Sequence, residues 1–301
     1  MFHSKLLSTA TMHRIEFTKV SGAGNDFVLI DDRLDSLPTN KPLLAQTLCS
    51  RVFGIGADGL LVLQKSNHVD FKMSYYNADG SFGGMCGNGG RCIARYAYLK
   101  GVAGPRMTFE ALDFNYMAEI NGENVRLWMK QPKNFKENIQ IKTELGVFAA
   151  YFIDNGSPHV IIFVEDVSTI NVHDIGRAIR ENNLFSPAGT NVNFVQVIGP
   201  NSISIRTYER GVEDETLACG TGSVAAALVS VLSGRVKHPV QVGVRSGEKL
   251  QVNFELRGES AHNVSLEGSA HMLFQGSAVY DSAKGKICRI STEIKPPQAR
   301  T

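Results

Sequence analysis

The chain has 301 residues, of which 43% are hydrophobic and 20% charged, and its formal net charge is +2. This composition is typical of a globular protein with a substantial core, folded as one large domain or as two of ordinary size. Its basic residues form no cluster apart from acidic ones, and no apolar run is long enough to cross a membrane. We therefore expect no nucleic-acid and no membrane partner.

The first fifteen residues contain no Asp or Glu and carry Lys5, His13 and Arg14 among Ser and Thr. Such a segment is either a short organelle transit peptide, which would imply a plastid, or an extension upstream of a start at Met12. We favour the second reading because the segment is short, and we expect residues 1–11 to be a disordered extension. No secretory hydrophobic region is present, so a reducing cytoplasm is expected.

Strand patterns dominate the rest of the chain, as apolar runs or as alternation of apolar and polar residues. In chain order they cover residues 15–20, 27–30, 71–76, 125–129, 147–153, 160–164, 192–198, 203–208, 240–244 and 250–256. Helical patterns are fewer and cover residues 41–53, 88–100, 174–183 and 222–233. The predicted fold class is a β-rich α+β protein.

A weak internal repeat is the most informative feature of the sequence. Cys86-Gly87-Asn88-Gly89 opens one helix and Cys219-Gly220-Thr221-Gly222 opens another. Each helix ends at a glycine fifteen residues after its cysteine, Gly101 and Gly234, where a left-handed C-cap is expected.

The surroundings of the two motifs also match. A strand and a polar loop precede each cysteine, a hairpin-like strand pair follows each helix, and residues 25–28 match residues 191–194. The repeat predicts two similar halves related by a pseudo-twofold axis, with a linker near 131–132. Equivalent residues of the two halves would then meet in one cleft.

Cys86 and Cys219 are the candidate catalytic residues. A cysteine at the start of a helix lies beside unpaired backbone N–H groups and the positive end of the helix dipole, which lower a thiol pKa. The glycines that follow let the same N–H groups approach an anion such as a carboxylate. Two facing copies would supply a base and an acid on opposite faces of a carboxylate compound, as inversion of a hydrogen-bearing stereocentre requires.

The other three cysteines, Cys49, Cys92 and Cys288, are interpreted as structural. The five together are odd in number and form no CxxC pair or zinc-ligand cluster. One Cys-Gly motif alone would be weak evidence, because most cysteines are small buried residues and nearby glycines usually serve turns. Two copies in matched contexts make the catalytic interpretation the stronger one.

Six segments resemble the diaminopimelate epimerase family and occur in that family's order between about residues 14 and 275. They are GAGNDF (22–27), GIGADG (54–59), NADGS (77–81), MCGNGGRC (85–92), YERG (208–211) and ACGTG (218–222). The resemblance implies an isomerase that interconverts LL- and meso-diaminopimelate in lysine and peptidoglycan-precursor biosynthesis. It implies no pyridoxal phosphate or other cofactor, no metal, and a homodimer in the cytoplasm.

The resemblance also implies a fold. It consists of two pseudo-symmetric domains, each a rolled, mostly antiparallel, barrel-like β-sheet around a central α-helix, with the site in the cleft between them. Residues 12–131 would form the half that carries Cys86, completed by a C-terminal strand from about 277–292. Residues 132–276 would form the half that carries Cys219.

By the same resemblance, Cys86 and Cys219 are the acid–base pair, and the remaining site residues fall into three groups. Those expected at the distal end of the substrate are Asn25, Asn77, Asn191 and Arg210, the last because a guanidinium can bind a carboxylate with two parallel hydrogen bonds. Those expected at the reacting carboxylate are Gly87, Asn88, Gly220 and Thr221. Those expected near the reacting centre are Glu209 and His159, which would orient the substrate ammonium and set thiol protonation.

Three positions depart from the family pattern. Ser157 stands in Gly-Ser-Pro-His where many members have Gly-Asn-Pro-His, so a substrate contact there would come from a hydroxyl. Gly59 replaces a Gln of some members, and Ser21 replaces a common His or Gln. These changes affect expected details of substrate binding and remove no catalytic group.

Two alternatives remain at the level of sequence. One is another two-cysteine racemase without a cofactor, of the proline or hydroxyproline type. Arg210 with three Asn side chains favours a longer substrate with a second amino-acid end. The other is a thiol redox sensor that uses a Cys86–Cys219 disulfide.

Overall fold

The computed structural model describes residues 12–258 and 260–293. The predicted extension at residues 1–11 lies outside the described residues. Among the described residues, four α-helices and eighteen strands form a mostly β structure of the α+β class, which agrees with the predicted class. No described helix has the length and hydropathy needed to span a bilayer.

The chain forms two compact units. Of the described residues, 12–21, 26–115 and 271–293 belong to unit 1, and 22–25 and 116–270 belong to unit 2. The predicted linker near 131–132 lies inside unit 2, because β7 (Asn124–Trp128) pairs with β16 (Ser260–Ser269) of that unit. The segment expected to complete the first half, 277–292, lies within the C-terminal part of unit 1.

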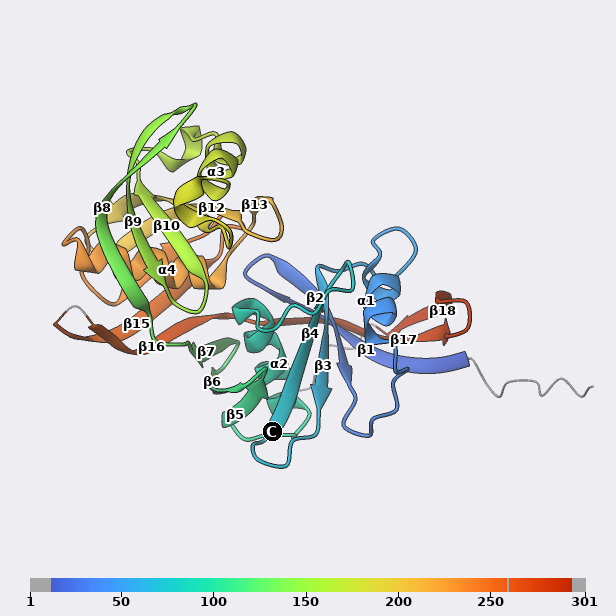
Figure 1. Cartoon of the computed structure of the whole chain (residues 1–301). Coiled ribbons are helices and arrows are strands. Elements are labelled where there is room, and N and C mark those ends of the chain that lie inside the picture. Colours follow the sequence, from blue (N-terminus) through green and yellow to red (C-terminus); the bar gives the residue numbers. More distant parts are fainter. Residues whose placement is uncertain (1–11, 259, 294–301) are drawn as a thin grey trace, which may run out of the picture. The chain divides into compact units, whose positions relative to one another are not determined.

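The sheet of unit 1 runs in the order β18-β17-β1-β2-β3-β4-β5 (Figure 1). β17 is antiparallel to β1 and β18, β2 is parallel to β3, and β4 is parallel to β5. The bounds of these strands are Met12–Gly22 (β1), Asn25–Asp31 (β2), Gly59–Gln64 (β3), Phe71–Asn77 (β4), Arg106–Ala111 (β5), His271–Asp281 (β17) and Lys286–Glu293 (β18). The helices of unit 1 are α1 (Lys41–Cys49) and α2 (Gly87–Leu99).

The sheet of unit 2 runs in the order β8-β9-β10-β11-β12-β14-β15-β16-β7. Its strands, besides β7 and β16, are β8 (Lys133–Thr143), β9 (Gly146–Asp154), β10 (Pro158–Phe163), β11 (Asn191–Gly199), β12 (Ser202–Glu209), β13 (Asp214–Thr216), β14 (Val240–Gly243) and β15 (Lys249–Arg257). β6 (Phe114–Asn121) pairs with β7. The helices are α3 (Val172–Arg180) and α4 (Gly220–Leu232), with short 3₁₀ turns at Val167–Thr169 and Asn183–Phe185.

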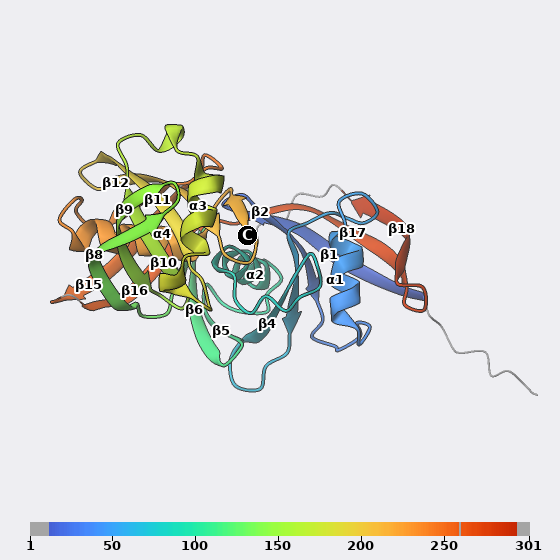
Figure 2. The same ribbon diagram turned by 45° about the horizontal axis from the view of Figure 1, so that its top comes forward.

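Helix α4 is the centre of unit 2. It contacts seven strands from β9 to β16, so the sheet wraps around it (Figure 1). The helix can occupy this place because it is apolar on all sides, with an unbroken buried run over residues 222–230. Helix α3 packs against β11 and β12 over a separate apolar cluster that includes Val172 and Ile179 (Figure 2).

Strand pairing shows the internal duplication directly. In unit 1, a parallel pair (β2, β3) flanks α1, and a second parallel pair (β4, β5) flanks α2. In unit 2, the parallel pair β10 and β11 flanks α3, and β12 and β14 flank α4. By this topology β2 corresponds to β10. The expected match of residues 25–28 in β2 with residues 191–194 in β11 was therefore wrong, because β11 is the next strand after β10. Asn25, at the start of β2, therefore corresponds to the start of β10, the strand that carries His159.

Both cysteine-opened helices end as the sequence predicts. Gly101 and Gly234, the residues after the C-caps, adopt φ of +67° and +69°, the left-handed conformation that glycine adopts without strain. Helix α1 ends earlier than predicted, at Cys49. There the chain folds back, and the N–H groups of residues 54–57 bond to carbonyls of residues 48–50. A side chain on Gly54 would overlap the Thr47 carbonyl, so this turn requires glycine.

Candidate functional site

Cys219 caps the N-terminus of α4 with its thiol. Its backbone is extended (φ −113°, ψ 114°), and its Sγ accepts the N–H of Gly222 at 3.4 Å. The Thr221 hydroxyl lies 3.5 Å from the same sulfur. Only 4% of Cys219 is exposed. The Cys219 sulfur therefore lies at the start of α4 with a backbone N–H directed at it.

His159 and Asn193 form a buried pair in unit 2. Both are fully buried, and Asn193 Nδ2 lies 3.2 Å from His159 Nδ1 and donates to the Val160 carbonyl at 3.0 Å. Asn193 Oδ1 accepts the Thr207 hydroxyl at 3.0 Å. Burial, aided by the positive charge of Arg210, lowers the pKa of His159 to about 3. The imidazole is therefore neutral at physiological pH.

The Asn191 side-chain amide joins the backbone of Arg210 to that of Pro158. The Arg210 N–H donates to Asn191 Oδ1 at 3.0 Å, and Asn191 Nδ2 donates to the Pro158 carbonyl at 3.0 Å. The Arg210 guanidinium donates to the Ala188 carbonyl at 3.0 Å and stays half-exposed. The ends of β10, β11 and β12 are thus held together with a positive charge at their edge.

Three further unit 2 residues lie around the N-terminus of α4 or at the end of β12. Glu209, the last residue of β12, accepts the Thr216 hydroxyl at 2.9 Å. The buried Asn155 donates Nδ2 to the Thr221 carbonyl at 2.7 Å, and so fixes the β9–β10 turn to the first turn of α4. Ser157 lies half-buried in that same turn.

Unit 1 holds the other cysteine in a matching place. Cys86 is the N-cap residue of α2, with an extended backbone (φ −114°, ψ 123°), and is half-buried; unlike Cys219, its side chain makes no capping hydrogen bond to the helix. Gly87 and Asn88 form the first turn and are buried. Arg91, fully buried one turn later, donates to Asn88 Oδ1 at 3.0 Å and to the Gly87 carbonyl at 3.4 Å. The Asn88 side-chain oxygen is therefore used within the helix, where it accepts from Arg91. The backbone N–H groups of this turn are the groups suited to an anion.

Asn77 and Asn25 both lie at strand ends. Asn77 is the last residue of β4, and its Nδ2 donates to the Ser81 hydroxyl at 2.9 Å across a tight loop with Gly80 at φ +85°. Asn25 is the first residue of β2 and groups with unit 2.

A partly buried ionic network, in which Lys19 is buried and Arg51 is exposed, follows Asn25. The Lys19 ammonium pairs with Asp26 at 2.6 Å and donates to the Gly56 carbonyl. Arg51 bridges Asp26 at 2.8 Å and Asp58 at 2.6 Å. Burial raises the pKa of Asp26, but the hydrogen bonds from Arg51 and Lys19 outweigh it and hold the pKa below its ordinary value. The network ties together the loops GAGNDF and GIGADG.

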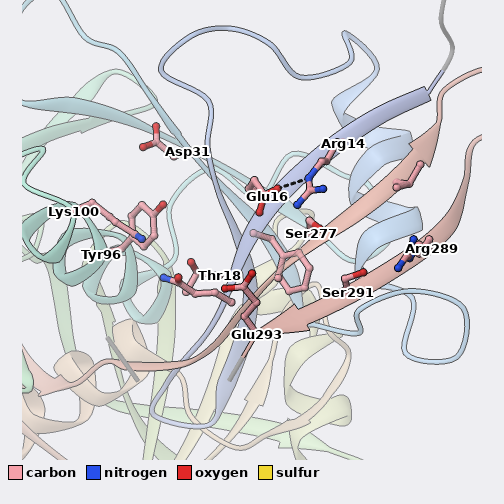
Figure 3. A pocket seen from close by; sticks show the side chains of 14 residues that line it. Arg14, Glu16, Thr18, Asp31, Tyr96, Lys100, Ser277, Arg289, Ser291 and Glu293 are labelled. Atoms are coloured by element: carbon pink, nitrogen blue, oxygen red, sulfur yellow. Dashed lines mark hydrogen bonds and ion pairs between the residues drawn. The ribbon is translucent and has the colours of Figure 1, made fainter. Parts of the chain in front are cut away.

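A groove of about 450 Å³ in unit 1 is separate from these residues (Figure 3). It lies along β1, β17 and β18 beside the end of α2, and its lining mixes acidic side chains, such as Glu16 and Asp31, with Arg14 and Lys100. Arg14 and Glu16 pair with each other at 2.7 Å. None of the predicted site residues lines it.

Of the predicted site residues, Cys86, Gly87 and Asn88 begin α2 and Cys219, Gly220 and Thr221 begin α4, whereas the others lie on strands or loops. Cys86, Gly87, Asn88 and Asn77 lie in unit 1, and the others lie in unit 2. Within residues 12–258 and 260–293, no group of three His, Cys, Asp or Glu residues is arranged to hold a metal ion.

A family model described as diaminopimelate epimerase matches residues 17–134 and 151–273. The chain belongs to the diaminopimelate epimerase family. The diaminopimelate epimerase of Chlorobaculum tepidum is 46% identical over 262 residues, covering 86% of this chain and 99% of that protein. The diaminopimelate epimerase of Aquifex aeolicus is 43% identical over 277 residues, covering 87% of this chain and 97% of that protein.

Solved structures of other proteins share the fold of this chain at low sequence identity. A probable proline racemase from Agrobacterium radiobacter aligns with a TM-score of 0.65 and 16% identity, over 86% of this chain and 91% of that chain. A phenazine biosynthesis protein of the PhzF family from Bacillus anthracis aligns with a TM-score of 0.68 and 13% identity, over 94% and 100%. The fold of two pseudo-symmetric domains predicted from the sequence is confirmed.

Sequence reasoning missed Asn193, Asn155 and Arg91. The sequence does contain a signal for Asn193, which is an amide inside the apolar run 192–198. A buried amide is unfavourable unless its hydrogen bonds are satisfied, so its presence there indicates specific polar partners. Arg91 lies inside the segment MCGNGGRC, but its burial depends on the packing of α2 against β3, β4 and β17.

Proposed function

We propose that this chain interconverts LL- and meso-diaminopimelate with Cys86 and Cys219 as its two acid–base groups. The observation that carries the proposal is that Cys86 and Cys219 are the N-cap residues of α2 and α4, in corresponding positions of two duplicated halves. The family relationship points to the substrate, and the two cysteines at the helix N-termini would provide the acid and the base.

In the proposed reaction, one cysteine is a thiolate and the other a thiol. The thiolate takes the α-proton, and the C–H electron pair stays on the substrate as a carbanion delocalised toward the α-carboxylate. The thiol then delivers its proton to the opposite face of Cα. The two cysteines exchange protonation states in each turnover. Because two thiolates close together would repel each other, the two cysteines would titrate as one coupled pair.

The carbanion needs fixed stabilisation, and the first turns of the two helices are suited to it. Backbone N–H groups at Gly87, Asn88, Gly220 and Thr221 would hold the reacting carboxylate, where negative charge grows in the transition state. The Gly222 N–H on Cys219 Sγ at 3.4 Å favours the thiolate at the same helix end.

The distal amino-acid end of the substrate would bind to Asn25, Asn77, Asn191 and Arg210. Arg210 offers a half-exposed guanidinium, and a guanidinium matches a carboxylate in charge and geometry. Glu209 and His159 would act near the reacting centre, and Ser157 would add a hydroxyl contact. We further propose that the enzyme works in the cytoplasm as a homodimer and without pyridoxal phosphate.

The test uses Cys86→Ala and Cys219→Ala, with Cys288→Ala as control because Cys288 is an exposed cysteine outside the motifs. Both motif variants should lose epimerisation of LL-diaminopimelate while keeping the wild-type circular dichroism and melting temperature. The control should keep wild-type turnover. Near wild-type turnover in either motif variant would refute the two-base mechanism.

Deuterium incorporation at Cα from solvent tests the substrate separately. The wild-type enzyme should exchange the α-proton of LL- and meso-diaminopimelate. Exchange on proline or alanine but not on diaminopimelate would move the assignment to another racemase of this fold.

A further inference from the structure

The orientation of the Asn193 amide is determined by its neighbours. The Val160 carbonyl oxygen can only accept a hydrogen bond, so the amide atom 3.0 Å from it is the nitrogen. The amide oxygen then faces the Thr207 hydroxyl, which donates to it at 3.0 Å. The second hydrogen of Nδ2 is directed to His159 Nδ1 at 3.2 Å.

This orientation determines the tautomer of His159. In a neutral imidazole one ring nitrogen accepts and the other carries the hydrogen. Because Nδ1 accepts from Asn193, the hydrogen must lie on Nε2. His159 is neutral, since burial and the charge of Arg210 bring its pKa to about 3. Its Nε2 is buried and has no hydrogen-bond partner among the described residues.

A buried N–H group without an acceptor is unfavourable, and native proteins rarely keep one. Diaminopimelate offers two kinds of polar group, ammonium groups that only donate and carboxylates that only accept. Of the polar groups of diaminopimelate, an Nε2–H group can therefore pair only with a carboxylate.

We propose that Asn193 is a positioning residue that holds His159 as the Nε2–H tautomer, so that His159 donates a hydrogen bond to a substrate carboxylate and does not act as a base. The identity of the carboxylate compound rests on the proposed function. In this arrangement His159 binds a carboxylate and does not orient the substrate ammonium, which is the role that the family resemblance implied. Asn193 also packs against the first turn of α4, because a Cβ on Gly222 would overlap Asn193 Oδ1 and lie 3.3 Å from Cys219 Sγ.

The tautomer can be read from the wild-type protein by two-bond ¹H–¹⁵N correlation of ¹⁵N-histidine-labelled enzyme. Nε2 couples to both ring C–H protons and Nδ1 to only one, so the spectrum identifies the nitrogen that carries hydrogen. The His159 signals are assigned by their loss in His159→Gln. We expect hydrogen on Nε2. Hydrogen on Nδ1 in the wild-type enzyme overturns the inference.

Variants of the pair test the role of Asn193. Asn193→Asp cannot donate to Nδ1 and should move the hydrogen to Nδ1, with turnover lowered about 100-fold, the effect of losing one fixed donor. Thr207→Val keeps the donor and should keep the Nε2–H tautomer. If Asn193→Asp does not fold, Asn193→Ala should give a mixture of tautomers. A pure Nε2–H signal in either Asn193 variant, or a switched tautomer with full turnover, contradicts the proposal.

Ligand probes separate this inference from the proposed function. Saturation with diaminopimelate should shift the Nε2–H signal, pimelate should shift it as a dicarboxylate, and 1,7-diaminoheptane should not. A shift with the diamine alone, or no shift with diaminopimelate in an active enzyme, overturns the carboxylate contact. An enzyme with hydrogen on Nε2 that does not exchange the α-proton of diaminopimelate would refute the proposed function and leave the tautomer assignment standing.

Discussion

Gly222 and Gly89 occupy the same place in the two halves, three residues after Cys219 and Cys86, and their replacement by alanine should have opposite consequences. At Gly222 the new methyl would overlap Asn193 Oδ1 and lie 3.2 Å from Cys219 Cβ. The Asn193 amide is held by three hydrogen-bonding neighbours and cannot move without breaking a contact. Overpacking of this kind costs about 1–3 kcal/mol.

At Gly89 the same methyl would meet flexible side-chain ends. Its nearest neighbours are Leu61 Cδ2 at 3.0 Å and Met73 Cε at 3.5 Å, which can rotate by a few tenths of an ångström. Replacement of glycine by alanine within a helix gains up to about 1 kcal/mol. We therefore expect Gly89→Ala to be neutral or slightly stabilising. Gly222→Ala should be about 1–3 kcal/mol less stable than Gly89→Ala.

Urea unfolding and epimerase turnover measure both effects. Gly222→Ala should also lower turnover about 100-fold, because displacement of catalytic groups by about 1 Å has that effect. Gly89→Ala serves as the matched control for helix propensity. If Gly222→Ala were as stable as Gly89→Ala and kept full turnover, the close packing of Asn193 on the start of α4 would be refuted.

Three further outcomes are expected. The lowered pKa of Asp26 means that its ion pairs stabilise the fold above the unfolded pKa of about 3.9 and lose this effect as pH falls through the folded pKa. The free energy of unfolding should therefore fall less steeply below about pH 4 in Asp26→Asn than in the wild type. The same pH dependence in both proteins would contradict a stabilising role of the network. Burial raises the pKa of the Cys49 thiol to about 12. Iodoacetamide at about pH 8 should therefore label exposed Cys288 but not Cys49 in the native protein, as measured by mass spectrometry of peptides. Labelling of Cys49 would argue against its burial. Glu209→Gln should lower kcat more than it raises KM, and an unchanged kcat would remove Glu209 from the reacting centre.

The sequence predicted the two cysteine-opened helices well because their signals are local. A cysteine and glycines at the start, helix formers within and a glycine at the end specify each helix without reference to the rest of the chain. Residues 88–100 and 222–233 were expected to be helical, and the helices cover Gly87–Leu99 and Gly220–Leu232.

The strands that were missed lack such local signals. β3 (Gly59–Gln64) is almost wholly buried, so its pattern is a short apolar run, which does not distinguish a strand from a buried helix segment. β8 (Lys133–Thr143) is mostly exposed, and two register shifts with Asn134 and Asn138 at positive φ interrupt its pattern. The C-terminal strand expected at about 277–292 is in fact two strands, β17 and β18, and β18 is exposed at nearly every position.

The buried pair of His159 and Asn193 shows why site geometry was less predictable than site membership. His159 was named from the family motif, but its burial and tautomer depend on the parallel register of β10 and β11, where His159 pairs with Asn191. That register follows from long-range pairing, which no local pattern specifies.

The position of β17 between β1 and β18 has a consequence for synthesis on the ribosome. Unit 2 is almost continuous in sequence, so it can fold as residues 116–270 emerge. Unit 1 begins with the first described strand but needs residues 271–293 to complete its sheet. Until the last part of the chain is released, one edge of β1 has no neighbour, and such edges promote aggregation. The half of the protein that is made first is therefore the half that finishes folding last.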